Sequence, residues 1–191
     1  MRRRTLLQMG GSTVTVGLAG CIARSTSTDP LVIRSSAFGD GGTLPGRFTC
    51  DGRGVSPPLT IESTPEDTTA FAVVARSTSG VFGNPVLWTC WNILRDASEI
   101  PAGIPRTATP ETFSGVRQGT ASDGDPGYRP VCPPKNQSTE YWVQVYALDA
   151  VLDTPAGAPN EDALDAIETQ QIASDRITVR YTRTGTPTRN S

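Results

Sequence analysis

The stretch CPPKNQSTEYWVQVYALD, residues 132–149, runs from a cysteine and two prolines through a polar loop into a strand-like segment. Its second half, YWVQVYAL from Tyr141, is rich in aromatic and β-branched residues, which favour extended structure. Pro133 and Pro134 have no backbone N–H to donate, so they are expected to form a rigid, apolar wall. The stretch therefore predicts a strand that is entered from a structured loop.

Other parts of the chain have the same strand-like composition, and the last of them alternates cleanly between apolar and polar residues. One short helix is expected where Asn160 can cap it and Leu164 and Ile167 form a narrow apolar stripe. Long segments rich in Gly, Pro, Ser and Asp separate these elements and predict loops. The further predicted strands are LVIRSSAF from Leu31, AFAVVAR from Ala70, PVLWTCWNIL from Pro85 and RITVRYTR from Arg176. The pattern predicts a mainly β sandwich with functional loops.

The first twenty residues are typical of an export signal, with three arginines ahead of a short, weakly apolar stretch. The arginines followed by TLL resemble a twin-arginine signal, and LAGC resembles a lipobox whose cysteine, Cys21, carries lipid. An uncleaved anchor helix is the weaker alternative, because glycines and hydroxyl residues dilute the apolar stretch. We expect a signal at residues 1–20, a flexible tether at 21–30, one domain at 31–183 and a polar tail at 184–191.

The chain of 191 residues has 17 basic and 19 acidic side chains. Without Arg2, Arg3 and Arg4 it has 14 basic against 19 acidic residues, a net charge of −5. This balance gives no support to nucleic-acid binding. Lys135 is the one lysine, a bias that resembles exported proteins of salt-loving archaea but also follows from a GC-rich genome. Composition does not separate these two explanations.

Catalysis and metal binding find little support in the residue types. The chain has no histidine, and its cysteines form no CxxC pair, so no metal site and no cofactor are expected. General acid–base catalysis would depend on carboxylates, and no pair of them is tied to a nucleophile. Cys90 lies in an apolar strand without an evident base, which favours a core residue. The sequence therefore predicts a protein that is not an enzyme, and a hydrolase is the weakest reading.

Five stretches, in this order, resemble the phosphatidylethanolamine-binding protein family, in particular its prokaryotic Raf-kinase-inhibitor-like branch. They are LPGRFTCDGRGVSPPL at 44–59, WNILRDASEIPAGIP at 91–105, GVRQGT at 115–120, GYRPVCPP at 127–134 and YWVQVYALD at 141–149. The resemblance implies a large antiparallel sheet packed on a smaller one, with one or two short helices. It also implies a shallow pocket at one end that binds phosphate-like anions.

The chain departs from the family pattern at its ionisable positions. Arg76 stands where the first aspartate of an Asp-Pro-Asp-Ala-Pro turn is expected. A gapless alignment places Leu87 at the first histidine, whereas a two-residue deletion would place Cys90 there. Thr139 replaces the histidine of a His-Arg-Tyr motif, in which Tyr141 is retained. Gln170 falls where many prokaryotic members have a further histidine.

The resemblance implies a ligand site whose walls are kept while its imidazoles are lost. The residues expected to contact ligand are Arg76, Leu87, Trp88, Pro133, Pro134, Thr139 and Tyr141. Two of these assignments compete with plainer ones: Arg76 with exposure to solvent, and Tyr141 with packing in the core. Cys50 and Cys132 lie in motifs whose loops approach this pocket, so a disulfide between them is a hypothesis.

Two functions remain open at this point. The first is a non-enzymatic binding domain for a small organic or anionic ligand, anchored by lipid on Cys21 to the outer face of the cytoplasmic membrane. The second is an interaction or inhibitor module with a vestigial pocket and a protein partner.

Overall fold

The computed structural model describes residues 29–78, 84–121 and 124–184. The predicted signal, Cys21, most of the tether and residues 185–191 of the tail lie outside the described residues. In chain order the elements are β1 (Val32–Arg34), the 3-10 helix η1 (Gly46–Phe48), β2 (Leu59–Ser63), β3 (Ala70–Ser77), β4 (Val86–Leu94), β5 (Glu99–Ile100), β6 (Arg117–Gln118), β7 (Ser138–Leu148), α1 (Asn160–Gln170) and β8 (Gln171–Thr182).

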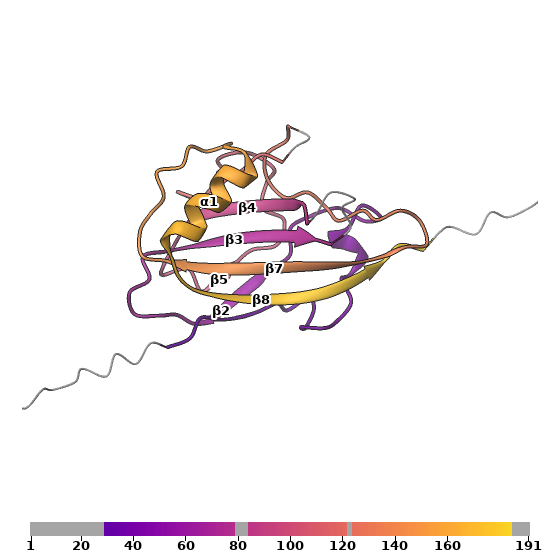
Figure 1. Ribbon diagram of the computed structural model, residues 1–191, viewed down its shortest axis with the longest axis horizontal. Coiled ribbons are helices and arrows are strands. Elements are labelled where there is room, and N and C mark those ends of the chain that lie inside the picture. Colours follow the sequence, from indigo (N-terminus) through magenta and orange to yellow (C-terminus); the bar gives the residue numbers. More distant parts are fainter. Residues whose placement is uncertain (1–28, 79–83, 122–123, 185–191) are drawn as a thin grey trace, which may run out of the picture.

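Two antiparallel sheets make up the fold. The large sheet has the order β6-β4-β3-β7-β8, and the small sheet has the order β1-β2-β5. Figure 1 shows the large sheet face-on, with α1 crossing one end of it in front and the small sheet behind. The predicted sandwich of a large and a small sheet with one short helix is confirmed. The expected strand segments contain β1 and β4 and overlap most of β3 and β7 and the second half of β8, which begins earlier, at Gln171. The strand β2 and the two-residue strands β5 and β6 were not predicted.

Alternation along the strands divides the large sheet into two faces. On the inner face, Phe71, Val73 and Ala75 of β3 pack with apolar residues of the small sheet in one cluster. On the opposite face, which we call the helix face, Ala72 and Val74 pack with α1 in a second cluster. Because side chains alternate along a strand, odd-numbered residues of β3 face inward and even-numbered residues lie on the helix face. In β8 the apolar residues of the alternating pattern, Ile177, Val179 and Tyr181, are all buried.

The helix α1 begins differently from the predicted capping arrangement. Pro159 occupies the cap position and makes no side-chain hydrogen bond to the helix. The Asn160 side chain instead accepts a hydrogen bond of 2.7 Å from the Thr89 hydroxyl and donates one of 3.4 Å to the Val86 carbonyl. Asn160 therefore ties the helix to β4 rather than capping it. The predicted apolar stripe is correct, since Leu164 and Ile167 are buried.

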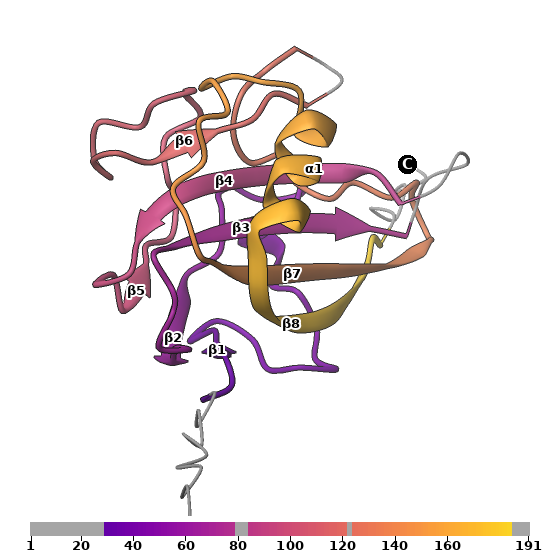
Figure 2. The same cartoon turned by 60° about the vertical axis from the view of Figure 1, so that its left-hand side comes forward.

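An irregularity in β4 controls which side chains reach the inner face. Ala75 pairs with Trp88, but the next residue, Arg76, pairs with Val86, so Leu87 is one extra residue on β4. Such a bulge turns a strand locally and changes where its side chains point. As a result Leu87 and Trp88, although adjacent in sequence, both join the inner cluster. Figure 2 shows β4 and β3 running side by side beneath α1.

Candidate ligand-binding site

Three buried aromatic residues and one amide form the centre of the candidate site. Trp88 and Tyr128 meet edge to face, with ring centroids 5.7 Å apart. The Trp88 indole N–H donates a 2.7 Å hydrogen bond to Gln118, whose amide in turn donates to the carbonyls of Pro105 and Thr107. These contacts hold the indole in one orientation. Tyr141, from β7, belongs to the same inner cluster and has no exposed surface.

The Tyr141 hydroxyl is buried without a hydrogen-bond partner among the described residues. Burial raises the pKa of Tyr141 well above its usual value, and the neighbouring Tyr128 raises it further. The Tyr128 hydroxyl donates to the Phe48 carbonyl at 2.8 Å, so its own proton is already used. A phenol in this setting stays protonated. Its O–H makes no hydrogen bond of ordinary length among the described residues, and the Tyr128 oxygen is the neighbour that interacts with it.

Thr139 and Leu87 flank this centre. Thr139 lies two residues before Tyr141 on β7 and therefore on the same face of the strand. Its hydroxyl lies 3.5 Å from that of Thr78, just after β3. The Leu87 carbonyl accepts the backbone N–H of Arg129 at 2.9 Å, which joins the β4 bulge to the loop containing Tyr128. The predicted residues Leu87, Trp88, Thr139 and Tyr141 thus reach one face of the large sheet.

Arg76 does not join them, which corrects the predicted grouping. In β3 it follows Ala75 of the inner face, and its partner on β7 is Trp142 rather than Tyr141. Alternation therefore places Arg76 on the helix face. There its charge lowers the pKa of Tyr146, although burial and Glu168 raise that pKa by more. The sequence placed Arg76 at the pocket rim through its position in the motif, which does not reveal the face of the strand.

The double proline forms part of a loop that is bound to the 44–54 segment. Pro133 is buried, whereas Pro134 is exposed. Next to them, Cys132 is linked to Cys50 by a disulfide with a Cα–Cα distance of 5.3 Å, as the sequence hypothesis proposed. The backbone N–H of Cys50 also donates to the Val131 carbonyl at 3.2 Å. The two loops that carry Phe48 and Tyr128 are thus joined covalently beside the aromatic centre.

Asp51 anchors these loops to the end of β8. The Tyr181 hydroxyl and the Arg183 guanidinium both donate to its carboxylate, the latter at 3.0 Å. Arg183 also donates to the Cys132 sulfur and to the Pro133 carbonyl, each at 3.3 Å. The hydrogen bond from Tyr181 is the largest cause that lowers the pKa of Asp51, and Arg183 lowers it further. Asp51 thus links the 44–54 segment both to the end of β8 and to the loop that carries Cys132.

The lowered pKa of Asp51 predicts how stability responds to acid. Its folded pKa lies below its unfolded pKa, so its contribution is complete above about pH 4 and is lost as the pH falls through the folded value. The Asp51→Asn variant lacks this titration. We therefore expect the melting temperature of the wild type to exceed that of the variant near neutrality and the difference to shrink below about pH 4. Thermal denaturation of both proteins between neutral pH and pH values below about 4 measures this difference. A difference in melting temperature that stays constant with pH would contradict the stabilising role of the ionised Asp51.

The residue set predicted from sequence missed Tyr128 and Gln118. Both lie inside motifs that carried the family resemblance, Tyr128 in GYRPVCPP and Gln118 in GVRQGT. A polar side chain in an otherwise apolar or glycine-rich motif indicates a residue with a specific partner, so Tyr128 and Gln118 could have been identified from the sequence. Arg183 and Tyr181 gave no such signal, because their partner Asp51 is more than a hundred residues away in sequence.

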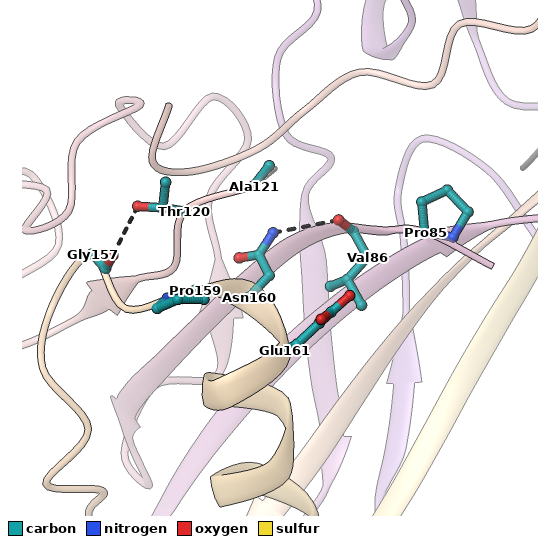
Figure 3. Close-up of a pocket in the computed structure, with 8 residues that line it drawn as sticks. All are labelled: Pro85, Val86, Thr120, Ala121, Gly157, Pro159, Asn160 and Glu161. Carbon is teal, nitrogen blue, oxygen red and sulfur yellow. Dashed lines mark hydrogen bonds between the residues drawn. The ribbon is translucent and has the colours of Figure 1, made fainter. Parts of the chain in front are cut away.

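A separate cavity of about 360 Å³ opens beside the start of α1 (Figure 3). Two polar side chains of its lining are already engaged: the Thr120 hydroxyl donates to the Gly157 carbonyl, and the Asn160 amide donates to the Val86 carbonyl. None of the residues predicted to contact ligand lines it. The full lining is Pro85, Val86, Thr120, Ala121, Gly157, Pro159, Asn160 and Glu161. The Tyr141 centre, which keeps a donor unused, is therefore the stronger candidate site.

Comparisons with known proteins agree with this architecture. The family model described as phosphatidylethanolamine-binding protein matches residues 34–182. A UPF0098 protein of Methanothermobacter thermautotrophicus is 32% identical over 151 residues, which cover 79% of this chain and 98% of the relative. LppC of Mycobacterium tuberculosis, whose name marks it as a candidate lipoprotein, is 30% identical, with 86% of this chain and 89% of the relative covered.

Solved structures show the same fold. The phosphatidylethanolamine-binding protein homologue CT736 of Chlamydia trachomatis superimposes with a TM-score of 0.70 and 26% identity, covering 81% of this chain and 98% of that structure. Escherichia coli YbcL, described as a member of the mammalian PEBP family, gives a TM-score of 0.73 at 24% identity. It covers 80% of this chain and 98% of its own.

Proposed function

Because the chain belongs to the phosphatidylethanolamine-binding protein family, we propose that it is a non-catalytic domain that binds a small ligand at the Tyr141 hydroxyl. The domain is exported and held at the outer face of the cytoplasmic membrane by lipid on Cys21. The ligand supplies an acceptor at ordinary hydrogen-bond distance, in place of the longer interaction that the hydroxyl has with Tyr128.

The single observation that carries this proposal is the unused Tyr141 donor. A buried hydroxyl without a partner costs about 1–3 kcal/mol of stability. Its neighbour Tyr128 is equally enclosed but has its partner in the Phe48 carbonyl. A buried polar atom without an internal hydrogen bond calls for an explanation, and a functional role is the one proposed for Tyr141.

The surroundings of Tyr141 favour a ligand that is uncharged at its contact point. Leu87, Trp88 and Tyr128 belong to the same inner cluster as Tyr141, and Thr139 lies two residues before it on β7. Arg76 lies on the helix face, so the cation that would pair with a phosphate is missing from this set. A carbonyl or ester oxygen needs one neutral donor and apolar walls, which this centre offers.

The absence of catalysis in the proposal rests on the state of the candidate nucleophile. Cys90 is buried, and burial raises the pKa of its thiol far above neutrality. A protonated, enclosed thiol is a poor nucleophile. Among residues 29–78, 84–121 and 124–184, no three His, Cys, Asp or Glu side chains gather as a metal site would require.

Membrane attachment in the proposal depends on the first 21 residues and on the likeness to LppC. Within the described part of the chain, no helix has the length and apolar character needed to cross a bilayer. Lipid on Cys21 would provide the attachment, supplemented by any further contact that the domain makes with the membrane.

A thermal-shift experiment with two matched variants tests the ligand site. Tyr141→Phe removes the unused hydroxyl, so without ligand its stability is expected to be unchanged or about 1 kcal/mol higher. Tyr128→Phe leaves the Phe48 carbonyl without its partner and is expected to lose about 1–2 kcal/mol. Small neutral amides and esters are screened beside inorganic phosphate and phosphoethanolamine. A compound present at a hundredfold excess over its Kd stabilises the wild type by about 2.7 kcal/mol.

The expected pattern is a rise in melting temperature that Tyr141→Phe abolishes and Tyr128→Phe retains. An ordered water that satisfies Tyr141 would leave every compound without effect, and that result would contradict a ligand-binding role. Stabilisation by phosphate that survives in Tyr141→Phe would also contradict it, because the anion would then bind elsewhere.

A further inference from the structure

The helix face of the large sheet is only partly covered. Figure 1 shows α1 lying over one end of β4, β3 and β7, while no helix or strand of the described residues covers the other end of β3, β7 and β8. On this uncovered part Trp142 of β7 lies directly opposite Arg76 of β3 and Thr178 of β8. Arg176 of β8 places its guanidinium 5.8 Å from the centre of the Trp142 ring. We call this surface the Trp142 face.

Trp142 differs from the other two tryptophans of the chain. Trp88 and Trp91 are completely buried, whereas Trp142 is half-buried. An indole between two arginines on an open sheet has an apolar ring to insert and cations to place beside it. Indole rings favour the boundary between lipid and water, where one part of the ring is apolar and the N–H is solvated.

The charge of this face is opposite to that of the protein as a whole. The chain carries a net charge of −2, but Arg76, Arg176 and Arg180 gather on the Trp142 face. Glu140 lies directly opposite Arg180 and balances it. The positive charge therefore comes from Arg76 and Arg176. Glu168 of α1 lies at the border near Tyr146, and Asp40, which accepts the Thr178 N–H at 2.8 Å, lies at the β8 edge beside Arg176. Arginine forks match phosphate oxygens in pairs, so the face suits a phosphate-bearing surface.

The N-terminal segment enters the fold at the β8 edge, on the inner side of the large sheet rather than on the Trp142 face. The backbone N–H of Ile33 donates to the Asp175 carboxylate at 2.8 Å, which places β1 beside β8 and one residue from Arg176. Cys21 precedes Asp29, the first described residue, by eight positions. Eight residues span at most about 28 Å when fully extended. Lipid on Cys21 would thus keep the β8 edge close to the bilayer.

We propose that the Trp142 face lies on an anionic phospholipid surface, with Trp142 inserted at the headgroup level and Arg76 and Arg176 on lipid phosphates. The surface is separate from the Tyr141 site, and the proposal shares only the lipid on Cys21 with the proposed function. Each arginine at such a surface contributes about 1 kcal/mol, or about fivefold in partition. The contact would orient the tethered domain and leave its inner loops away from the membrane.

The experiment uses the full chain with Cys21→Ser, so that no lipid is attached. Sedimentation with vesicles of phosphatidylcholine and phosphatidylglycerol in equal amounts is compared with sedimentation with phosphatidylcholine alone, at low salt. We expect binding to the mixed vesicles only, in spite of the net negative charge of the protein. Arg76→Gln and Arg176→Gln are each expected to weaken it about fivefold. The matched control is Arg53→Gln, an exposed arginine in the 44–54 loop, which should change it less than twofold.

A second readout identifies the inserted side chain. Brominated lipids quench tryptophans that contact acyl chains, and only Trp142 of the three is positioned to be quenched. We expect quenching that disappears in Trp142→Phe. Absence of sedimentation, equal losses in Arg53→Gln and Arg76→Gln, or quenching that persists in Trp142→Phe would each overturn the proposal. Arginine-dependent binding to polyglutamate without binding to vesicles would overturn it as well, because an acidic protein would then be the partner.

Discussion

Removal of the Cys50–Cys132 disulfide is expected to lower the free energy of unfolding by about 3 kcal/mol, within the usual range of 2–4 kcal/mol. The bridge joins residues 82 positions apart, and closing so long a loop restricts the unfolded chain strongly. For a chain of this size the loss corresponds to a fall in melting temperature of roughly 10 °C. The double variant Cys50→Ala/Cys132→Ala, or reduction of the wild type, produces this loss.

The double variant also serves as the control for reduction. Thermal denaturation with and without a phosphine reductant should separate the two states of the wild type and leave the double variant unchanged. Titration of thiols in denatured protein should reveal two additional thiols after reduction. If those thiols appear while the melting temperature stays constant, the bridge does not stabilise the fold. Loosening of the loops that carry Phe48 and Tyr128 should also weaken any ligand that depends on Tyr141.

Replacement of Gly119 by alanine is expected to cost about 4 kcal/mol, which combines overpacking with a lost buried hydrogen bond. A Cβ at this position would lie 2.2 Å from the Thr89 hydroxyl and 2.4 Å from the Asn160 side-chain oxygen. It would therefore break the contact that ties α1 to β4. The carbonyl of Ala158, at 3.2 Å, leaves little room on the remaining side.

Gly39→Ala is the matched control for Gly119→Ala. A Cβ on Gly39 meets no atom within 4 Å, so this substitution is expected to change stability by less than about 0.5 kcal/mol. Chemical denaturation of the two variants provides the free energies. Equal stability of Gly119→Ala and wild type would show that α1 can shift away from β4 at little cost. Neither substitution alters Tyr141 or Trp142 itself, although Gly119 follows Gln118 of the candidate site and Gly39 lines a hollow with Arg176.

The strand pattern predicted most of the large sheet because its signal is local. In the segments that form β3, β4, β7 and β8, apolar, β-branched and aromatic residues follow one another without Gly or Pro in the interior. The alternation in β8 also identified the residues that point inward. The strands β5 and β6 have two residues each, which is too short for any periodicity to be visible.

The candidate site was predicted in part. Motif positions correctly grouped Leu87, Trp88, Thr139 and Tyr141 on one face, and they brought Cys50 near Cys132. They failed at Arg76, because a motif position defines distance along the chain and not the direction of a side chain. They also could not reveal that the Tyr141 hydroxyl lacks a partner, since this depends on where Phe48 meets Tyr128.

The amino-acid sequence alone determined the class of fold, the family resemblance and the loss of histidine from the whole chain. Each of these follows from which residues are present and how they are spaced over a few positions. In a strand, that local spacing is enough to determine the structure. Tertiary structure decided which face receives Arg76, how the bulge at Leu87 turns two neighbours inward, and which donor stays unpaired. These outcomes depend on strand register and on contacts between segments that are far apart in sequence. Such contacts contribute free energy only in the folded protein, where the segments are in contact.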